Sequence, residues 1–346
     1  MKKKALWAIF TLCLSALTIY GLFHNSGLSI SELITNIKES SPLWLIPAAL
    51  CMLGFIFFEG RSLVLILRTL GYPAKKRRGF LYASADIYFS SITPSATGGQ
   101  PASAYFMYKD GVTAIEVTVS LILNVVMYNL ALVTLGILTL IFFPGIFSDF
   151  NLASKIMILI GITVILLLVV FFIVLLKNQK LIQKFVNIVI SILHKFHIKS
   201  LAEKLQAKVD NTIENYNECV VTLAGRKRLL VKTYLLNFLQ RTSQILVTVF
   251  CYFAMHGSLN GGLKIFAIQT YVVLGSNFIP VPGAVGISEF IMFFGYMMMM
   301  NEESAYSLAI LSSGISFYTC IIISIITVII GYILIFYKQK KQEEKR

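Results

Sequence analysis

Long apolar runs set the first limit on how this chain can fold. Six of them have about the length that a helix needs to cross the roughly 30 Å of hydrocarbon in a bilayer. With 57% hydrophobic and only 13% charged residues, the 346-residue chain is too apolar for a soluble globular protein. We therefore predict an all-α polytopic membrane protein. The predicted crossings are residues 5–23, 43–67, 117–143, 156–176, 229–255 and 305–336.

Two short stretches rich in proline and glycine interrupt this pattern. Residues 90–101 read SSITPSATGGQP, and residues 280–286 read PVPGAVG. Proline lacks the amide hydrogen and paired glycines favour non-helical backbone, so each stretch predicts the end of one helix and the start of another. The apolar arms beside each break are too short to span a bilayer. We therefore predict two re-entrant helical hairpins, because irregular backbone at membrane depth needs protein or a polar cavity around it.

Basic residues mark the side of the membrane that we expect to be cytoplasmic. The formal net charge of +14 gathers in short clusters beside the apolar runs, within residues 2–4, 61–78, 177–232 and 338–341. This is the positive-inside pattern, and it indicates membrane flanks instead of nucleic-acid binding. It predicts cytoplasmic N- and C-termini. It also predicts a cytoplasmic amphipathic segment at residues 177–232, partly on the membrane surface with anionic headgroups as counter-charge.

The order of these elements predicts an internal duplication within one integral membrane domain, residues 1–346. Residues 1–150 and 151–346 each contain a crossing, a second crossing, a hairpin and a third crossing. The first hairpin would open to the cytoplasm and the second to the outside. Inverted repeats with broken helices that meet near the midplane form the substrate sites of many transporters. The alternative is that both breaks are packing kinks.

The breaks also supply the first candidate site residues. The second arm of each hairpin begins at its break, so its free amides and positive helix end would face the interior and favour an anion such as phosphate. Glycine at these positions could instead serve close helix packing. The candidate substrate-binding residues are Thr97, Gly98, Gly99, Gln100 and Ser103 at the first break, and Gly283, Gly286, Ser288 and Glu289 at the second.

A charged residue deep in a predicted crossing is the second kind of candidate. Arg241 lies about 18 Å from the start of its crossing at helical rise. It is either a counter-charge for a lipid phosphate or the structural partner of Glu289 or Asp86. Glu289 and Asp86 are also candidates for accepting a coupling proton, although Glu289 could simply cap its helix. Glu116 is a weaker candidate for the same two roles, proton acceptor or helix cap.

Other charged groups and motifs carry less weight. Glu59 and Arg61 are expected near the inner interface, with a topological role. His194 and His197 share a helix face, but no cysteine or carboxylate completes a metal set. No Ser-His-Asp spacing, P-loop or GxGxxG motif is present, and the five cysteines include no CxxC pair. We predict no catalytic residue, metal or cofactor.

The two breaks carry a family resemblance. TPSATGGQP at residues 93–101, followed by Tyr105 and KDG at 109–111, together with PVPGAVGISE at 280–289, resembles the lysylphosphatidylglycerol synthase transmembrane family. This is the flippase-like domain of the multiple peptide resistance factor proteins, and it also occurs free-standing. The resemblance covers nearly the whole chain. It implies a bacterial inner-membrane protein, associated with antibiotic resistance, that moves a phosphate-bearing or aminoacylated lipid between leaflets.

Two departures from that family limit what the resemblance implies. Many relatives carry an acidic residue after the glycine pair and an arginine three positions later, where this chain has Gln100 and Ser103. A headgroup preference based on those charges does not carry over. The resistance proteins also add a soluble domain that transfers the aminoacyl group from tRNA. Because this chain ends at Arg346, just beyond its last predicted crossing, we expect no phosphatidylglycerol lysyltransferase activity from it.

Three functions remain open from the sequence. The first is translocation of a phospholipid, anionic or aminoacylated, through a polar cavity between the hairpins. The second is a membrane-embedded lipid-modifying transferase, with Glu289 or Asp86 as the acid or base. The third is a non-transporting scaffold that binds anionic lipid or a partner synthase through residues 177–232. The expected partners are membrane phospholipids, a lipid synthase or a second copy of the chain, and no nucleic acid.

Overall fold

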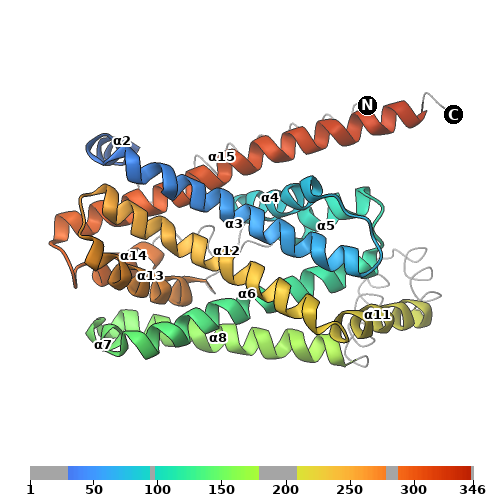
Figure 1. The fold of residues 1–346 in the computed structure, drawn as a ribbon, viewed down its shortest axis with the longest axis horizontal. Helices are drawn as coiled ribbons and strands as arrows, with labels where there is room; N and C mark the ends of the chain where they lie inside the picture. Colours follow the sequence, from blue (N-terminus) through green and yellow to red (C-terminus); the bar gives the residue numbers. More distant parts are fainter. Residues whose placement is uncertain (1–29, 94–97, 179–208, 278–286, 344–346) are drawn as a thin grey trace, which may run out of the picture.

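The computed structural model describes residues 30–93, 98–178, 209–277 and 287–343, and the regular elements in these ranges are helices (Figure 1). The long ones are α3 (Pro42–Thr69), α6 (Ala114–Phe142), α8 (Leu152–Lys177), α12 (Lys227–Ala254) and α15 (Glu302–Glu343). The shorter ones are α2 (Ile30–Glu39), α4 (Lys76–Ile92), α5 (Gly99–Lys109), α7 (Pro144–Asp149), α11 (Val209–Ala224), α13 (Gly262–Ser276) and α14 (Ile287–Tyr296), with the 3-10 turn η2 (Leu259–Gly261).

Four of the described helices are long and apolar enough to cross a bilayer: α3, α6, α8 and the part of α15 up to Ile335. The prediction of an all-helical, multi-pass membrane protein is confirmed to that extent. The crossing expected at residues 5–23 lies outside the described residues. The crossing expected at 229–255 corresponds to α12, which has the necessary length but a more polar sequence and does not meet the same criterion.

The position of α12 explains its polar sequence. It lies antiparallel to α3 and also packs against α6, α13 and α15. The amide of Ser41, just before α3, donates to the carbonyl of Ala254 at the end of α12 (2.8 Å). Surrounded in this way, α12 turns its polar side chains towards other helices, where hydrogen-bond partners replace water.

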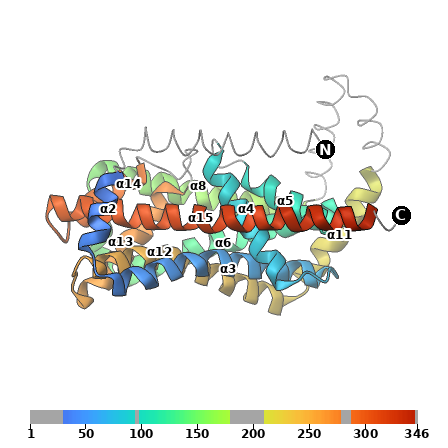
Figure 2. The ribbon, with the colours of Figure 1, turned by 90° about the horizontal axis from the view of Figure 1, so that it is seen from above.

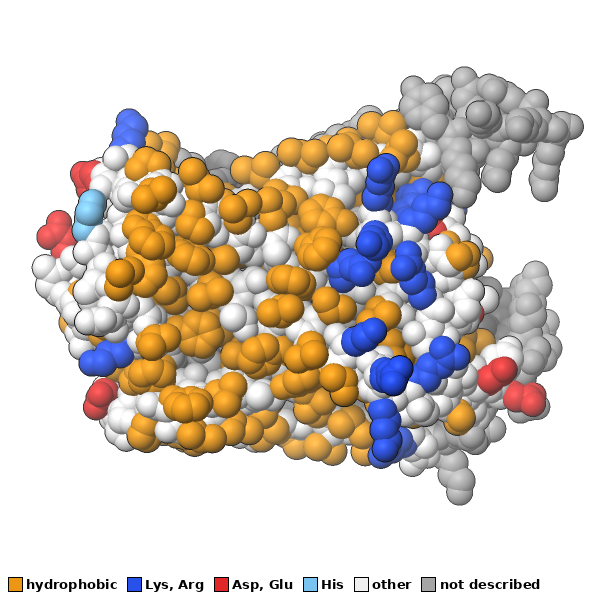
Figure 3. Space-filling model, viewed as in Figure 1, with side chains coloured by type: hydrophobic (Ala, Val, Ile, Leu, Met, Phe, Trp, Pro, Cys, Tyr) orange, Lys and Arg blue, Asp and Glu red, His pale blue; other side chains and the backbone are white. Residues whose placement is uncertain are grey.

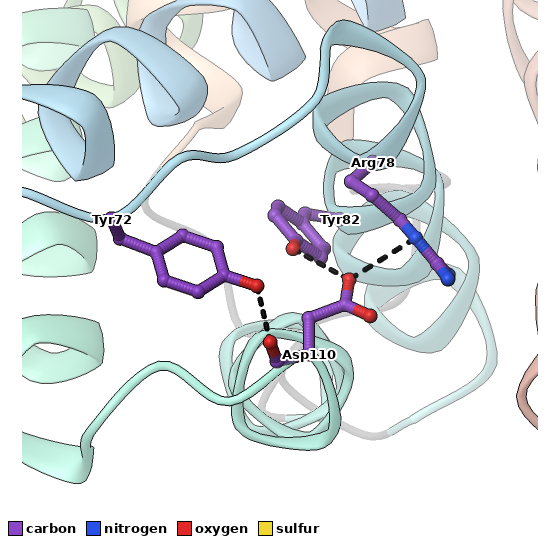
Figure 4. A network of polar contacts seen from close by, with 4 residues as sticks. All are labelled: Tyr72, Arg78, Tyr82 and Asp110. Carbon is purple, nitrogen blue, oxygen red and sulfur yellow. Dashed lines mark hydrogen bonds and ion pairs between the residues drawn. The ribbon is translucent and has the colours of Figure 1, made fainter. Parts of the chain in front are cut away.

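The first break joins α4 and α5, which pack against each other. Their open ends meet at Asp110, directly after α5 (Figure 4). Its carboxylate accepts a hydrogen bond from Tyr82 (2.7 Å) and pairs with Nε of Arg78 (3.3 Å), while its main-chain oxygen accepts a bond from Tyr72. The chain therefore returns, at the end of α5, to the end of the molecule where α4 begins.

The second break joins α13 and α14, which also pack against each other, at the opposite end of the molecule (Figure 1). The hydroxyl of Tyr296, at the end of α14, donates to Oε1 of Gln269 on α13 (2.6 Å). The connecting residues 278–286 lie outside the described ranges. The two short-helix pairs, α4 with α5 and α13 with α14, therefore lie at opposite ends of the molecule.

Close glycine contacts fix each hairpin against a long helix. A Cβ on Gly60 of α3 would overlap the backbone of Gly79 on α4, and the reverse is also true. In the second hairpin, a Cβ on Gly161 of α8 would overlap the carbonyl of Leu274 on α13. Glycine permits such backbone contacts because it has no Cβ, so these positions set how deeply each hairpin sits against its neighbour.

Surface chemistry follows the long axis of the molecule. Figure 3 shows apolar side chains across the middle of the visible face and a band of Lys and Arg towards the end that carries α5 and α11. At the same end, α11 packs against α6, and its buried Tyr216 donates to the carbonyl of Leu175 (3.4 Å). This part of the predicted 177–232 segment therefore packs on protein, whereas residues 179–208 lie outside the described ranges.

Candidate functional site

A stripe of polar residues runs along the buried side of α12. It consists of Thr233, Asn237, Gln240, Arg241 and Gln244, each of which lies three or four residues from another member, as expected for one face of a helix. Arg241 lies halfway along α12, and its side chain is only 7% exposed. A charged group at that depth is costly unless something in the site uses it.

The surroundings of Arg241 stabilise its charge without pairing it fully. Its guanidinium carbon lies 4.6 Å from the ring centroid of Tyr128 and 5.9 Å from that of Phe55, and Nη1 donates to Oε1 of Gln244 (2.8 Å). No carboxylate of the described residues lies within 4.0 Å of it. Its buried Nε has no hydrogen-bond partner in the described part of the chain. The cation therefore retains capacity to bind an anion.

Glu59 provides the first of two acidic groups near this cation. Its side chain is 6% exposed, and Oε2 accepts a hydrogen bond from Nε2 of Gln240 (2.8 Å). Glu59 and Asp86 of α4 lie close enough to interact electrostatically with each other and with Arg241. The sequence led us to expect Glu59 near the inner interface with a topological role. In the structure its side chain is buried against α12, and α3 continues ten residues beyond it, to Thr69.

Asp86 joins the two arms of the first hairpin. Its Oδ2 accepts from Nε2 of Gln100 on α5 (2.5 Å), and its Oδ1 accepts from the hydroxyl of Ser90 (3.2 Å). A Cβ at Gly99 would overlap both Asp86 Oδ1 and Ser90 Oγ. Gly99 thus leaves room for the carboxylate to lie against the first turn of α5. We refer to Glu59, Asp86, Gln100, Gln240 and Arg241 as the central polar cluster.

One turn closer to the basic end of α12, a second polar group joins three helices. Nδ2 of Asn237 donates to the hydroxyl of Ser62 on α3 (2.9 Å) and to Oδ1 of Asn124 on α6 (3.2 Å). Ser62 also donates to Asn124 Oδ1 (2.7 Å). All three side chains are nearly inaccessible to solvent. This network fixes the register of α3, α6 and α12, and with it the position of the central polar cluster.

The predicted residues of the first break have different partners. The amide of Gly98, expected to be free, donates to the hydroxyl of Thr93 (2.9 Å). Gly99 and Gln100 contact Asp86, as described above. Ser103 is fully buried, and its hydroxyl has no partner in the described part of the chain. Thr97 lies outside the described residues. The positive end of α5 thus already faces a carboxylate of the protein itself.

The second break contributes less to the cluster. Gly283 and Gly286 lie outside the described residues, and α14 begins at Ile287. The hydroxyl of Ser288 donates to Oε2 of Glu289 (3.0 Å) in the first turn of α14. Of the two acids proposed as partners of Arg241, the structure brings Asp86 into its electrostatic environment, together with Glu59.

The remaining candidates from the sequence lie outside the central polar cluster. Glu116 forms a capping box with Thr113 at the start of α6, which favours its capping interpretation. No group of three or more His, Cys, Asp or Glu side chains in the described ranges is arranged to hold a metal ion. Sequence reasoning missed Glu59 and Tyr128. The one signal for Glu59 was an acidic residue inside an apolar run, which the neighbouring Arg61 obscured.

Comparison with known proteins identifies a family whose matched region includes all of the helices described above that form the polar cluster. The family model described as the lysylphosphatidylglycerol synthase TM region matches residues 8–324. A UPF0104 membrane protein of Archaeoglobus fulgidus is 25% identical over 268 residues, which is 75% of this chain and 78% of that protein. The matched region contains both hairpins and all of α12. The resemblance drawn from the two break motifs is confirmed: this chain belongs to the lysylphosphatidylglycerol synthase TM region family.

Proposed function

We propose that this protein moves a phosphate-bearing phospholipid, anionic or aminoacylated, between the leaflets of a bilayer. The observation that carries the proposal is Arg241, a buried cation halfway along α12 with an unpartnered Nε. Insertion scales put an unpaired arginine at the centre of a membrane helix at a cost of about 2.5–3.5 kcal/mol. A headgroup phosphate that pairs with the guanidinium during passage would explain why a buried arginine with this cost is present.

The proposed topology has six crossings and two re-entrant hairpins in an inverted repeat. The return of α5 to the start of α4 supports the first hairpin, and the contact between Tyr296 and Gln269 supports the second. The band of Lys and Arg in Figure 3 supports a cytoplasmic position for the open end of the first hairpin. The second would then open to the outside, with both termini cytoplasmic in a bacterial inner membrane.

The headgroup would occupy the space around Arg241, between α12 and the first hairpin. Gln100 and Gln240 carry further polar groups near the same place, and the lipid tails would remain in the bilayer. A partner synthase or a second copy of the chain could supply or receive the lipid at the basic end.

One observation favours a second candidate, a membrane-embedded transferase. Glu59 and Asp86 are two carboxyl groups that lie close enough to interact electrostatically, and neighbouring carboxyls can serve general acid-base chemistry. Such an enzyme would modify its lipid covalently, whereas a translocator returns it unchanged. A third candidate, a lipid-binding scaffold, would do neither.

Reconstitution in liposomes separates these functions. A fluorescent phosphatidylglycerol in the inner leaflet should reach the outer leaflet with the wild-type protein and stay protected from an external quencher with Arg241→Ala. The matched control is Arg228→Ala, which removes the same charge from an exposed position on α12. Arg241→Lys, which keeps the charge but not the fork of donors, should retain part of the activity.

The lipid itself is then extracted and analysed by mass spectrometry. Unchanged lipid with leaflet exchange supports translocation. A new lipid product supports the transferase. Equal exchange by wild type and by folded Arg241→Ala would refute the proposed role of Arg241 in transport.

A further inference from the structure

Two neighbouring residues of α12 leave opposite hydrogen-bonding groups unused. Arg241 has a vacant donor, Nε, and Gln240 has a vacant acceptor, Oε1, because neither atom has a hydrogen-bond partner in the described part of the chain. The two side chains are 7% and 2% exposed, respectively. Buried polar groups in proteins are nearly always paired, so a vacant donor next to a vacant acceptor needs a physical explanation.

Existing contacts fix where the two side chains lie. Nε2 of Gln240 donates to Oε2 of Glu59 on α3 (2.8 Å), which leaves the amide oxygen free to accept. The guanidinium carbon of Arg241 lies 5.9 Å from the ring centroid of Phe55, which is four residues before Glu59 on the same face of α3. Both side chains therefore reach the same turn of α3, where one headgroup could contact both.

A third vacant atom adds to the acceptor side. Oδ1 of Asn237, one turn before Arg241, is buried without a partner among the described residues, while its Nδ2 donates to Ser62 and Asn124. Two of these three vacant atoms are thus acceptors. A phosphodiester brings only acceptor oxygens, so it can pair with the guanidinium but leaves the amide oxygens unpaired. A ligand that satisfies this site must also bring a donor.

We propose that Gln240 selects phospholipids whose headgroup carries a hydroxyl or a primary ammonium group beside the phosphate. The phosphate pairs with the guanidinium of Arg241, and the headgroup O–H or N–H donates to Oε1 of Gln240. This selection rests on the proposed function, since it names the class of headgroup that the same site carries. Gln240 is then a specificity-determining residue.

The state of the empty site supplies the energetic reason. The vacant atoms are inaccessible to solvent, so water does not pair with them in this conformation. Unpaired buried groups raise the free energy of the empty site, and a ligand that pairs with both removes that cost. A headgroup must enter by a movement of the surrounding helices, and the hydrogen bonds that it forms offset the free energy of this movement.

Two pairs of lipids separate the effect of the donor from that of the charge. Phosphatidylglycerol and phosphatidylpropanol are both anionic and have headgroups of the same carbon number, but only the first carries free hydroxyls. Phosphatidylethanolamine and phosphatidylcholine are both zwitterionic, but methylation leaves the choline nitrogen without an N–H. In each pair, the lipid without a donor leaves Oε1 of Gln240 unpaired and should bind roughly ten- to a hundredfold more weakly.

The experiment measures binding and transport separately. Native mass spectrometry of the full-length protein gives the binding of each lipid, and liposomes give its leaflet exchange. Tighter binding and faster exchange of phosphatidylglycerol than of phosphatidylpropanol support the proposal. Equal binding of these two lipids would overturn it, whatever the second pair shows, because they differ only in their hydroxyls.

Gln240→Met keeps the length of the side chain and removes the acceptor. The ratio of phosphatidylglycerol to phosphatidylpropanol exchange should fall to about one in this variant. A merely structural role would lower the exchange of both lipids and leave the ratio unchanged, which would contradict the proposal. If the variant does not fold, as judged by circular dichroism, the lipid comparison in the wild type decides.

Gln244→Met is the matched control. Gln244 is the same residue type one turn further along α12, but its Oε1 already accepts from Nη1 of Arg241 (2.8 Å). Its replacement should lower the exchange of both lipids and preserve their ratio. A loss of the ratio as large as in Gln240→Met would overturn the role assigned to Gln240.

The remaining arms distinguish the source of the ligand and the two proposals. Glycerol phosphate presents the same hydroxyls and phosphate without acyl chains, and binding of it as tight as that of phosphatidylglycerol would overturn the assignment to a lipid headgroup. Selective binding of phosphatidylglycerol without any leaflet exchange overturns the translocation proposal and leaves the selection by Gln240 established. Exchange of all four lipids at equal rates overturns the selection, while the translocation proposal stands.

Discussion

The two hairpins are anchored alike but surrounded by different chemistry. Each lies in backbone contact with a long helix, at Gly60 in the first and at Gly161 in the second. The first hairpin contributes Asp86 and Gln100 to the central polar cluster, and Asp110 closes its open end. In the second, buried apolar side chains of α13 and α14 dominate, with a hydrogen bond between Tyr296 and Gln269. Similar connectivity in two halves therefore does not imply similar chemistry.

The described charged groups around Arg241 are distributed unequally between the two halves. The charges that could recognise a headgroup lie on α3, α4 and α12, and they meet at the first hairpin. The described part of the second hairpin packs against α8 and α15. Under the proposed function we therefore assign headgroup recognition to the first hairpin, and we expect substitutions in the described part of the second to act mainly on stability.

The largest expected effects come from the glycine anchors. Gly161→Ala would push a methyl group into the carbonyl of Leu274, and Gly60→Ala would do the same to the backbone of Gly79. Each should destabilise the fold by about 1–3 kcal/mol, because backbone cannot move aside as a side chain can. Thermal unfolding in detergent measures this loss. Gly145→Ala, where nothing lies within 4 Å of the added Cβ, is the matched control.

Gly60→Ala and Gly161→Ala should differ in lipid-exchange activity, although both reduce stability. In the protein that remains folded, Gly60→Ala should reduce lipid exchange, since it shifts α4 and with it Asp86. Gly161→Ala should leave the exchange per folded molecule near the wild-type rate. Equal losses of activity would break the assignment of recognition to the first hairpin.

The sequence predicted the elements well because local chemistry decides them. The prolines and glycines at residues 90–101 end one helix and start another regardless of tertiary context. Arg241 was identified for a similar reason, since a charge deep in an apolar crossing is conspicuous. The electrostatic interaction of Glu59 with Asp86 could not be predicted in this way, because it depends on how α3 and α4 cross. Likewise, no local pattern shows that Thr93 satisfies the amide of Gly98.

Intermediate effects are expected from the polar contacts of each half. Asn237→Leu removes the donor to Ser62 and Asn124, and Tyr296→Phe removes the donor to Gln269. Hydrogen bonds between membrane helices contribute about 0.5–2 kcal/mol to stability. The loss in Asn237→Leu should lie at the upper end of this range, because the substitution removes the hydrogen bonds to two partners. Unfolding measurements give both values.

The same pair of variants sharpens the comparison. Asn237→Leu should also lower lipid exchange, because the register of α3 against α12 positions Glu59 beside Arg241. Tyr296→Phe should leave exchange unchanged. A larger loss of activity in Tyr296→Phe than in Asn237→Leu would reverse the roles assigned to the two hairpins.

The smallest effect is expected at the open end of the first hairpin, outside the spanning helices. Burial raises the pKa of Tyr72, and the charge of Asp110 raises it further, against a lowering effect of Arg78. Because the neutral phenol is favoured in the folded state, its contribution to stability is present below the unfolded pKa of about 10 and is lost as pH rises through the folded pKa. Asp110→Asn should lower the pKa of Tyr72 only in part, since burial is the larger cause.

Alkaline titration of phenolate absorbance, with Tyr72→Phe as the reference for difference spectra, measures this shift. Asp110→Asn also removes the ion pair with Arg78, which is partly exposed, so the stability lost at neutral pH should be about 0.2–1 kcal/mol. A complete return of Tyr72 to its ordinary pKa would mean that the turn opens when the carboxylate is removed. In that case Asp110 would hold the hairpin closed, and the first hairpin would depend on polar contacts at its base as well as on the glycine anchor.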